Sequence, residues 1–187
     1  SNDGFGGTDT LTNIEGLSGG SIYADTFHGN DENNDLYGNF SGADNIWGYG
    51  GDDYIFVAEM GGTIDGGDGI DRFYIQNFRY ISDGATGSVI EEGTEAGIVI
   101  NLDAGTATDA FGVTGAISNF ENADGGGGDD ILTGDAGNNV LSGGDGNDTI
   151  NGLDGDDTLE GGIGNDTFIA SLGTDQINGG TEYDTYD

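Results

Sequence analysis

A nine-residue repeat runs without interruption from residue 125 to residue 187 and constrains the fold more than any other feature of the chain. Its pattern is Gly-Gly-x-Gly-x-Asp-x-apolar-x, which residues 143–151 (GGDGNDTIN) and 161–169 (GGIGNDTFI) follow closely. One polar ligand and one core residue in every unit predict a solenoid that binds metal ions while its strands stack. Position six is Asp130, Asn139, Asp148, Asp157, Asp166, Asp175 and Asp184, and position eight is Leu132, Leu141, Ile150, Leu159, Phe168, Ile177 and Tyr186.

A weaker copy of the repeat spans residues 20–74, with Gly38 as a one-residue insertion. Its position eight is apolar in every unit, but its glycine positions are eroded. We therefore expect some metal sites in this block to be weak or missing. Position six is Asp25, Asn34, Asp44, Asp53, Gly62 and Asp71, and position eight is Phe27, Leu36, Ile46, Ile55, Ile64 and Phe73.

The segment between the two blocks breaks the period. Within it, residues 97–102 (GIVINL) predict a buried strand, and residues 116–121 (AISNFE) predict a strand that leads into the repeats. A similar string at residues 11–15 (LTNIE) precedes the first block, so one cassette is used twice. Residues 82–97 predict an exposed loop. The expected segments are a lead-in strand segment (1–19), a degenerate repeat block (20–74), a β-strand linker (75–124) and a second repeat block (125–187).

The charge of the chain limits its partners. It carries 36 acidic residues against 2 basic ones, a formal net charge of −34, and self-repulsion at this density opposes compaction. Multivalent cations would relieve that repulsion, whereas nucleic acid and anionic membranes need basic residues for contact. The absence of Cys excludes disulfides and thiolate metal sites. No stretch is apolar enough for a transmembrane helix, so we expect no membrane insertion.

The repeats resemble those of the RTX (repeats-in-toxin) proteins, also called hemolysin-type calcium-binding repeat proteins. The resemblance covers both blocks and implies an all-β fold, a right-handed parallel β-roll (β-solenoid) with two units in each 18-residue turn. It also implies a secreted bacterial protein, exported by type I secretion, that acts outside the cell or at its surface. We expect this chain to be part of a longer protein of that kind.

In such a coil each position-six residue faces the one on the next turn, about 4.8 Å away. Two bare carboxylates about 5 Å apart repel by roughly 3 kcal/mol at an effective dielectric of 20, and a cation between them reverses the sign. Calcium suits the site because it accepts many oxygen ligands in flexible geometry, whereas magnesium demands a tight octahedron. The expected pairs are Asp130 with Asp148, Asp148 with Asp166, Asp166 with Asp184, Asn139 with Asp157, Asp157 with Asp175, Asp25 with Asp44, Asn34 with Asp53, and Asp53 with Asp71.

The glycines of the repeat are expected to allow positive φ at positions one, two and four and to let backbone carbonyls crowd inward. By resemblance, carbonyls of loop positions one to five complete each calcium site. Two departures put sites in doubt: residues 170–175 lack the leading glycines, and Glu182 replaces a glycine. The loop residues concerned are Gly125, Gly127, Gly134, Gly143, Gly144, Asp145, Gly146, Asn147, Gly152, Asp154, Gly155, Gly161, Gly162, Ile163, Gly164 and Asn165.

A core one side chain thick cannot offset the entropy of ordering the chain, so calcium binding should be coupled to folding. The expected function is a calcium-binding module that folds after secretion and serves as a scaffold for neighbouring domains. The alternative is an adhesin, surface-layer or polysaccharide-binding segment. Phe56, Trp47 and Tyr49 are expected to pack between the coil and the linker, or alternatively to form a carbohydrate-stacking patch. We find no catalytic constellation and expect any enzymatic activity to lie in other parts of the parent protein.

Overall fold

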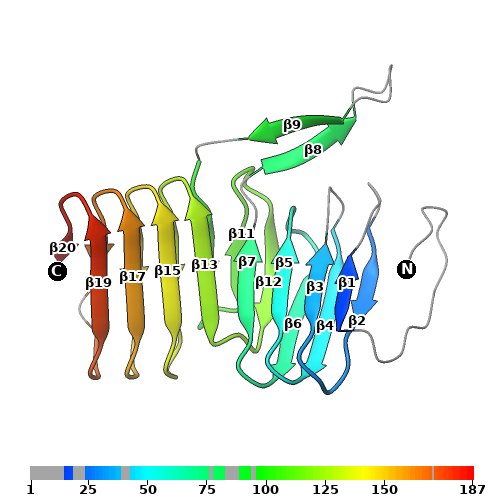
Figure 1. The fold of residues 1–187 in the computed structure, drawn as a ribbon, viewed down its shortest axis with the longest axis horizontal. Helices are drawn as coiled ribbons and strands as arrows, with labels where there is room; N and C mark the ends of the chain where they lie inside the picture. The colour runs from blue at the N-terminus through cyan, green and yellow to red at the C-terminus, as the bar shows by residue number, and fades with distance from the viewer. Residues whose placement is uncertain are drawn as a thin grey trace.

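The computed structural model describes residues 15–18, 24–38, 43–75, 78–82, 89–93, 96–169 and 171–187. Within these residues the chain is all-β and contains no helix. From β1 to β7 and from β12 to β20, successive strands alternate between two sheets that face each other, so the chain winds as a flattened coil (Figure 1). Most neighbouring strands are parallel, which confirms the predicted β-solenoid of stacked turns of about 18 residues.

The first sheet has eight strands, one for each turn of the coil, and all of its pairings are parallel. Its strands, in spatial order, are β1 (Gly16–Ser18), β3 (Asp35–Gly38), β5 (Tyr54–Val57), β7 (Arg72–Ile75), β13 (Asn122–Gly127), β15 (Val140–Asp145), β17 (Thr158–Ile163) and β19 (Gln176–Thr181).

The second sheet has ten strands because an antiparallel hairpin is inserted near its middle. The hairpin strands β10 and β11 widen this sheet by roughly 10 Å relative to the first sheet. In spatial order the strands are β2 (Thr26–His28), β4 (Asn45–Gly50), β6 (Thr63–Asp68), β12 (Thr114–Ser118), β11 (Thr106–Thr108), β10 (Val99–Asn101), β14 (Ile131–Thr133), β16 (Thr149–Asn151), β18 (Thr167–Phe168) and β20 (Thr185–Tyr186).

The two repeat blocks form one continuous coil. In the first sheet β7 pairs directly with β13, with Arg72 opposite Asn122 and Phe73 opposite Ala123. In the second sheet β12 continues the N-terminal block, because Ile117 lies opposite Ile64. We call this junction, from β7 to β13 and from β12 to β14, the seam.

The segment between the blocks differs from its prediction in two places. Val89–Gly93 forms strand β9, which pairs antiparallel with β8 (Phe78–Ser82), so the expectation of a loop throughout residues 82–97 is wrong. This hairpin stands away from the coil in Figure 1. The buried strand predicted at residues 97–102 is shorter and alternates: Ile98 and Ile100 are buried, whereas Val99 is 39% exposed.

The lead-in strings also have only part of their predicted structure. Residues 116–121 do not form one strand, because β12 ends at Ser118 and Asn119 turns the chain with a φ of 56°. Of the corresponding string at residues 11–15, only Glu15 lies within the described residues. Its carbonyl oxygen accepts a hydrogen bond from the amide of Asp35.

The core lies between the two sheets and contains the position-eight side chains, joined by residues outside the repeat pattern such as Ile98, Ile100 and Phe120. The position-eight residues predicted for the core are buried from Phe27 to Phe168. The prediction is wrong for Ile177 and Tyr186, which are 40% and 59% exposed. Both lie on β19 and β20, the last strands of their sheets, so no further turn packs against them.

Candidate metal centres

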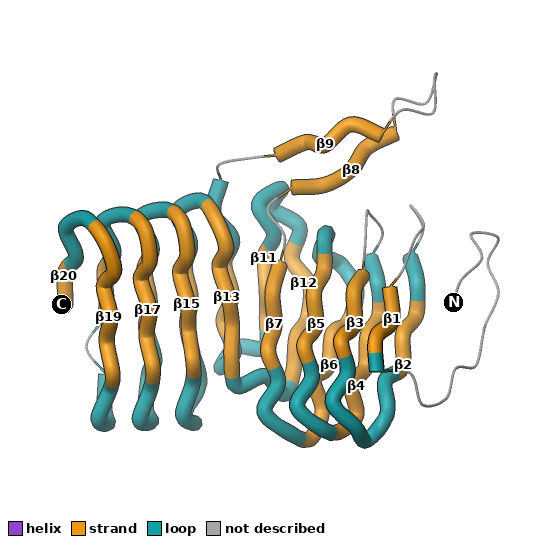
Figure 2. Tube along the Cα trace, in the orientation of Figure 1, coloured by secondary structure: helices purple, strands orange, loops and turns teal. Residues whose placement is uncertain are grey.

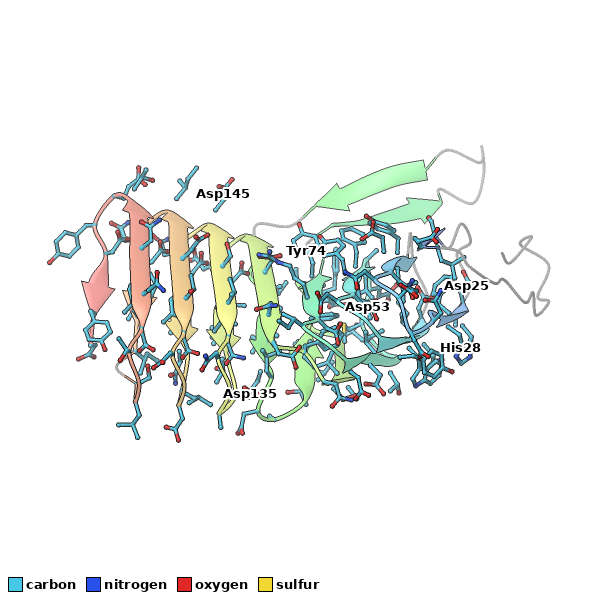
Figure 3. The ribbon with its side chains drawn as sticks, turned by 60° about the horizontal axis from the view of Figure 1, so that its bottom comes forward. Asp25, His28, Asp53, Tyr74, Asp135 and Asp145 are labelled. Atoms are coloured by element: carbon cyan, nitrogen blue, oxygen red, sulfur yellow. The ribbon has the colours of Figure 1, made fainter. Side chains whose placement is uncertain are left out.

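The position-six residues form two rows, one along each edge of the coil. The forward row lies on turns that lead from the first sheet to the second, and the return row lies on turns that lead back (Figure 2). Figure 3 shows the two edges through the labelled residues Asp145 and Asp135, which belong to turns on opposite sides of the coil. The forward row contains Asp25, Asp44, Asp130, Asp148, Asp166 and Asp184, and the return row contains Asn34, Asp53, Asp71, Asn139, Asp157 and Asp175.

Within each repeat block, hydrogen-bond ladders connect the position-six residues of successive turns. The backbone amide of one position-six residue donates to Oδ1 of the position-six residue on the next turn, at distances from 2.8 to 3.1 Å. The structure brings together every pair expected from the sequence, including Asp25 with Asp44 across the Gly38 insertion. One carboxylate oxygen therefore contacts backbone, and the two carboxylates of a pair do not face each other bare.

The second carboxylate oxygen points toward the position-one glycine of its own unit. A Cβ added to Gly125 would lie 2.3 Å from Oδ2 of Asp130 and 2.5 Å from the carbonyl oxygen of Gly143 on the next turn. The two oxygens thus converge on a space that only glycine leaves open. Among the described residues, the buried Oδ2 atoms without a hydrogen-bond partner are those of Asp53, Asp71, Asp130, Asp148, Asp157 and Asp166.

Burial raises the pKa of these carboxyl groups. Desolvation raises the pKa of Asp44 and Asp130 from 3.8 to about 7, against the opposing effect of the backbone amide that each accepts. The same cause raises the pKa of Asp53, Asp71 and Asp148 to about 6. Buried carboxylates of this kind need a counter-charge to remain ionised near neutral pH.

The arrangement fits a hard cation with oxygen ligands. No group of three or more acidic, His or Cys side chains converges anywhere in the described part of the chain. A metal at these turns would therefore be held by one or two carboxylates and several backbone carbonyls, a ligand set that calcium accepts and zinc disfavours. The orphaned Oδ2 atoms and the adjacent carbonyls are the observations that favour calcium.

The glycines of the repeat have two different physical roles. Gly144 and Gly146, at positions two and four, have φ of 107° and 138°, as predicted. The position-one glycines do not have positive φ, so that part of the prediction is wrong. They are required instead because a side chain would meet Oδ2 of the position-six residue, as at Gly134, Gly143, Gly152 and Gly161.

The side chains at loop positions three and five are exposed or are hydrogen-bonded to other turns. At position three, Asp145, Asp154 and Ile163 are exposed. At position five, the side chains of Asn147 and Asn165 accept hydrogen bonds from backbone amides of the following turn. These side chains thus form a second ladder that runs in the direction opposite to the position-six ladder. Only their backbone carbonyls are left as the predicted calcium ligands.

The units with altered sequences keep the fold but change individual contacts. Gly62 gives Asp44 no carboxylate on the next turn. In the return row, Asp175 lies 3.1 Å from the amide of Asp157, but its Oδ2 accepts a hydrogen bond from Ser171. Glu182 takes a φ of 75° and so tolerates the conformation of the glycine it replaces.

Sequence reasoning missed Glu121 as a member of the return row. The strand register places Glu121 between Asp71 and Asn139, and its Oε2 accepts the amide of Asp71 at 2.8 Å. A signal was present, because Glu121 lies nine residues before Asp130 and is therefore in phase with the repeat. Asp109 was also missed. It is buried and accepts amides of Met60, Phe111 and Val113, a structural role at the base of the inserted hairpin.

The aromatic residues singled out from the sequence do not form one patch. Trp47 stacks on His28 with ring centroids 4.9 Å apart, and Tyr49 stacks on the same imidazole, all on the second sheet. Phe56 lies on the first sheet and stacks on Tyr74 at 5.2 Å. The rings therefore stack along neighbouring turns of the coil, which contradicts a patch made of all three.

Within the described residues no helix has the length and apolarity needed to cross a membrane.

Comparison with known proteins agrees with the geometry of the repeat turns. A search of curated proteins finds no match to the chain. The RTX calcium-binding nonapeptide repeat matches four stretches, residues 19–40, 41–59, 124–159 and 151–186, which together cover more than half of the chain. With its repeats, its β-solenoid and its two rows of buried carboxylates, the chain belongs to the RTX calcium-binding nonapeptide repeat family.

Proposed function

We propose that this chain is a calcium-dependent folding module of a secreted protein and that it forms a rigid scaffold once calcium is bound. The observation that carries the proposal is the set of buried, unpartnered Oδ2 atoms along both rows. Without a cation each is a desolvated acceptor or a protonated acid, and either state costs free energy. With calcium bound, the same atoms become ligands and the repulsion of a chain with net charge −34 is reduced.

The coupling to folding follows from where the ligands lie. At Gly125 the pocket combines Oδ2 of Asp130 with the carbonyl oxygen of Gly143 on the next turn, and Gly134, Gly48 and Gly161 repeat this pairing of a position-six side-chain oxygen with a carbonyl oxygen. The ligands therefore come together only when the turns have stacked, so the free energy of binding is free energy of folding. Extracellular calcium modules have Kd values of about 10⁻⁴ to 10⁻³ M. A chain with sites in this range stays unfolded in the cytoplasm and folds after export, which suits passage through a secretion channel.

A calcium titration followed by far-UV circular dichroism tests the proposal, with magnesium as the control ion. The expected result is a cooperative change from coil to β-structure near millimolar calcium that magnesium does not produce. A chain that is already fully β-structured in chelator would contradict the coupling. We propose no catalytic activity for this chain.

A second candidate function, binding of extracellular polysaccharide, is favoured by the aromatic stack on the second sheet. His28, Trp47 and Tyr49 stack with small interplanar angles, and Tyr49 is 50% exposed. Flat exposed rings of this kind can pack against the apolar faces of sugar rings. Co-sedimentation with insoluble polysaccharides, in calcium, compares the chain with Trp47→Ala. Equal retention of the two proteins would argue against this function.

A further inference from the structure

The seam contains the elements of one more site, built partly from residues outside the repeats. Asp71 and Glu121 are separated by 50 residues, yet the amide of Asp71 donates to Oε2 of Glu121 at 2.8 Å. This is the contact that links successive carboxylates elsewhere in both rows, with glutamate in place of aspartate. Glu121 therefore fills the position-six place at the seam, and its link to the next turn is a hydrogen bond from Nδ2 of Asn139 to its carbonyl oxygen.

The rest of the pocket is also conserved in its geometry. Oδ2 of Asp71 is buried and has no hydrogen-bond partner, and the residue itself is 0% exposed. A Cβ added to Gly66 would lie 2.7 Å from this oxygen and 2.1 Å from the carbonyl oxygen of Asn119. The carbonyl of Asn119 thus takes the place that the position-one carbonyl of the next unit has at Gly48, where Gly66 provides it.

The turn that provides these ligands is much shorter than a repeat turn. Ser118 lies opposite Asp65, and Asn122 lies opposite Arg72. Asn119, Phe120 and Glu121 therefore bridge the same gap as the six residues 66–71. Asn119 reverses the chain with a φ of 56°, and Phe120 is buried against Phe73. The extra methylene of glutamate extends the carboxylate from this tighter turn.

The proposed ligands Glu121 and Asn119 border a cavity at the return edge. A cavity of about 350 Å³ opens beside the turn where the inserted hairpin separates it from the next return turn. Glu121, Asn119, Asp103 and Asp135 lie in its wall. Glu121 and Asn119 therefore border this cavity, whereas Asp71 does not line it and is fully buried.

We propose that Asp71, Glu121 and the carbonyl oxygen of Asn119 form an additional calcium site that joins the two repeat blocks at the seam. The inference rests on the proposed function, since it assumes that the repeat turns themselves bind calcium. The buried Oδ2 of Asp71 is the orphaned ligand, and Glu121 adds a second negative charge. The site makes folding of the two blocks a single calcium-dependent event.

The test compares Glu121→Gln with Glu160→Gln. Glutamine keeps an oxygen that can accept the Asp71 amide but removes the negative charge. Glu160 is exposed on β17, so its variant is matched in chemistry and in net charge but lies away from both rows. Calcium bound per chain is measured by equilibrium dialysis against radioactive calcium. We expect Glu121→Gln to bind one ion fewer than wild type and Glu160→Gln to bind the wild-type number.

A second measurement decides the matter if Glu121→Gln fails to fold. Calcium-grown crystals of the wild-type chain should give an anomalous peak bounded by Asp71 Oδ2, Asn119 O and the Glu121 carboxylate. Peaks at the repeat turns without one at the seam would overturn the inference and leave the proposed function intact, as would equal calcium counts in all three proteins. A wild-type chain that binds no calcium would overturn both.

Discussion

Arg72 donates from Nε and Nη2 to both carboxylate oxygens of Asp124, each at 2.6 Å, and so ties β7 to β13 across the seam. The chain contains only two basic residues of this kind against 36 acidic ones. Arg72, one of these two, stabilises the junction at which the second sheet has two more strands than the first. The hydrogen bonds to Asp124 raise the pKa of Arg72, so the guanidinium keeps its positive charge.

Replacing Arg72 with alanine should weaken the coupling of the blocks. Surface ion pairs contribute little, but a bidentate arginine pair stands above that level, and the Arg72 side chain is partly exposed. We expect Arg72→Ala to lose about 1 kcal/mol of stability in urea unfolding at saturating calcium. Arg79→Ala removes the other arginine, on β8, and serves as the control. Equal losses in the two variants would show that overall charge, and not the seam, is responsible.

In the absence of calcium, acid should stabilise the coil. The folded-state pKa is about 7 for Asp44 and Asp130 and about 6 for Asp53, Asp71 and Asp148, against an ordinary value of 3.8. Between these limits the folded chain holds more protons than the unfolded chain. The stability that this proton binding contributes to the folded chain is therefore fully present below about pH 4. It is lost as the pH rises through 6 to 7.

Circular dichroism in chelator at a series of pH values measures this effect, and we expect more β-structure at pH 4.5 than at pH 7.5. Asp148→Asn should flatten the dependence because it removes one of the buried groups. Asp145→Asn changes an exposed carboxylate of the same turn, whose charge is only the smallest cause of the raised pKa of Asp148, and should flatten it much less. A chelated chain with the same spectrum at both pH values would contradict the prediction. With calcium present the sign reverses, because protons compete for the ligand oxygens.

The position-one glycines should be intolerant of even a methyl group. A Cβ at Gly48 would lie 2.1 Å from Oδ2 of Asp53 and 2.1 Å from the carbonyl oxygen of Gly66, both of which would have to move. We expect Gly48→Ala to cost about 1–3 kcal/mol and to raise the calcium concentration at the folding midpoint. Gly50 belongs to the same turn, but there a Cβ would meet only ordinary contacts at 3.6 Å.

Gly50→Ala is therefore the matched control, and its calcium titration should superimpose on that of wild type. Both variants are compared by circular dichroism against calcium concentration and by urea unfolding at saturating calcium. Similar midpoints for Gly48→Ala and Gly50→Ala would mean that the space over Gly48 has no part in binding.

The repeat made the coil predictable, because position and chemistry recur with a fixed period. The position-six pairs and the buried position-eight residues from Phe27 to Phe168 follow directly from that period. The connection at the seam could not be predicted in the same way. Pairing of β7 with β13 joins residues 50 positions apart, and no local pattern specifies it. Glu121 was missed for a related reason: its row is defined by the stacked turns, whereas its own turn lacks every glycine of the repeat.

The role of position-one glycine was also beyond sequence reasoning. The same residue type serves positive φ at Gly144 and close approach at Gly143, and composition alone does not separate the two. Exposure of Ile177 and Tyr186 depends on what covers the last turn, which the period of the repeat does not specify.

The two position-six asparagines should respond differently to a carboxylate. Nδ2 of Asn34 is buried without a hydrogen-bond partner among the described residues, so Asn34→Asp removes an orphaned donor and adds a ligand charge. Nδ2 of Asn139 donates to the carbonyl oxygen of Glu121 at 2.9 Å, a bond that Asn139→Asp would lose beside an existing negative charge. We expect Asn34→Asp to lower the calcium concentration at the folding midpoint, by roughly the 1–3 kcal/mol of an unsatisfied buried group. Asn139→Asp should gain less or nothing. Calcium titration of both variants measures the difference, and a larger gain at Asn139 would contradict it.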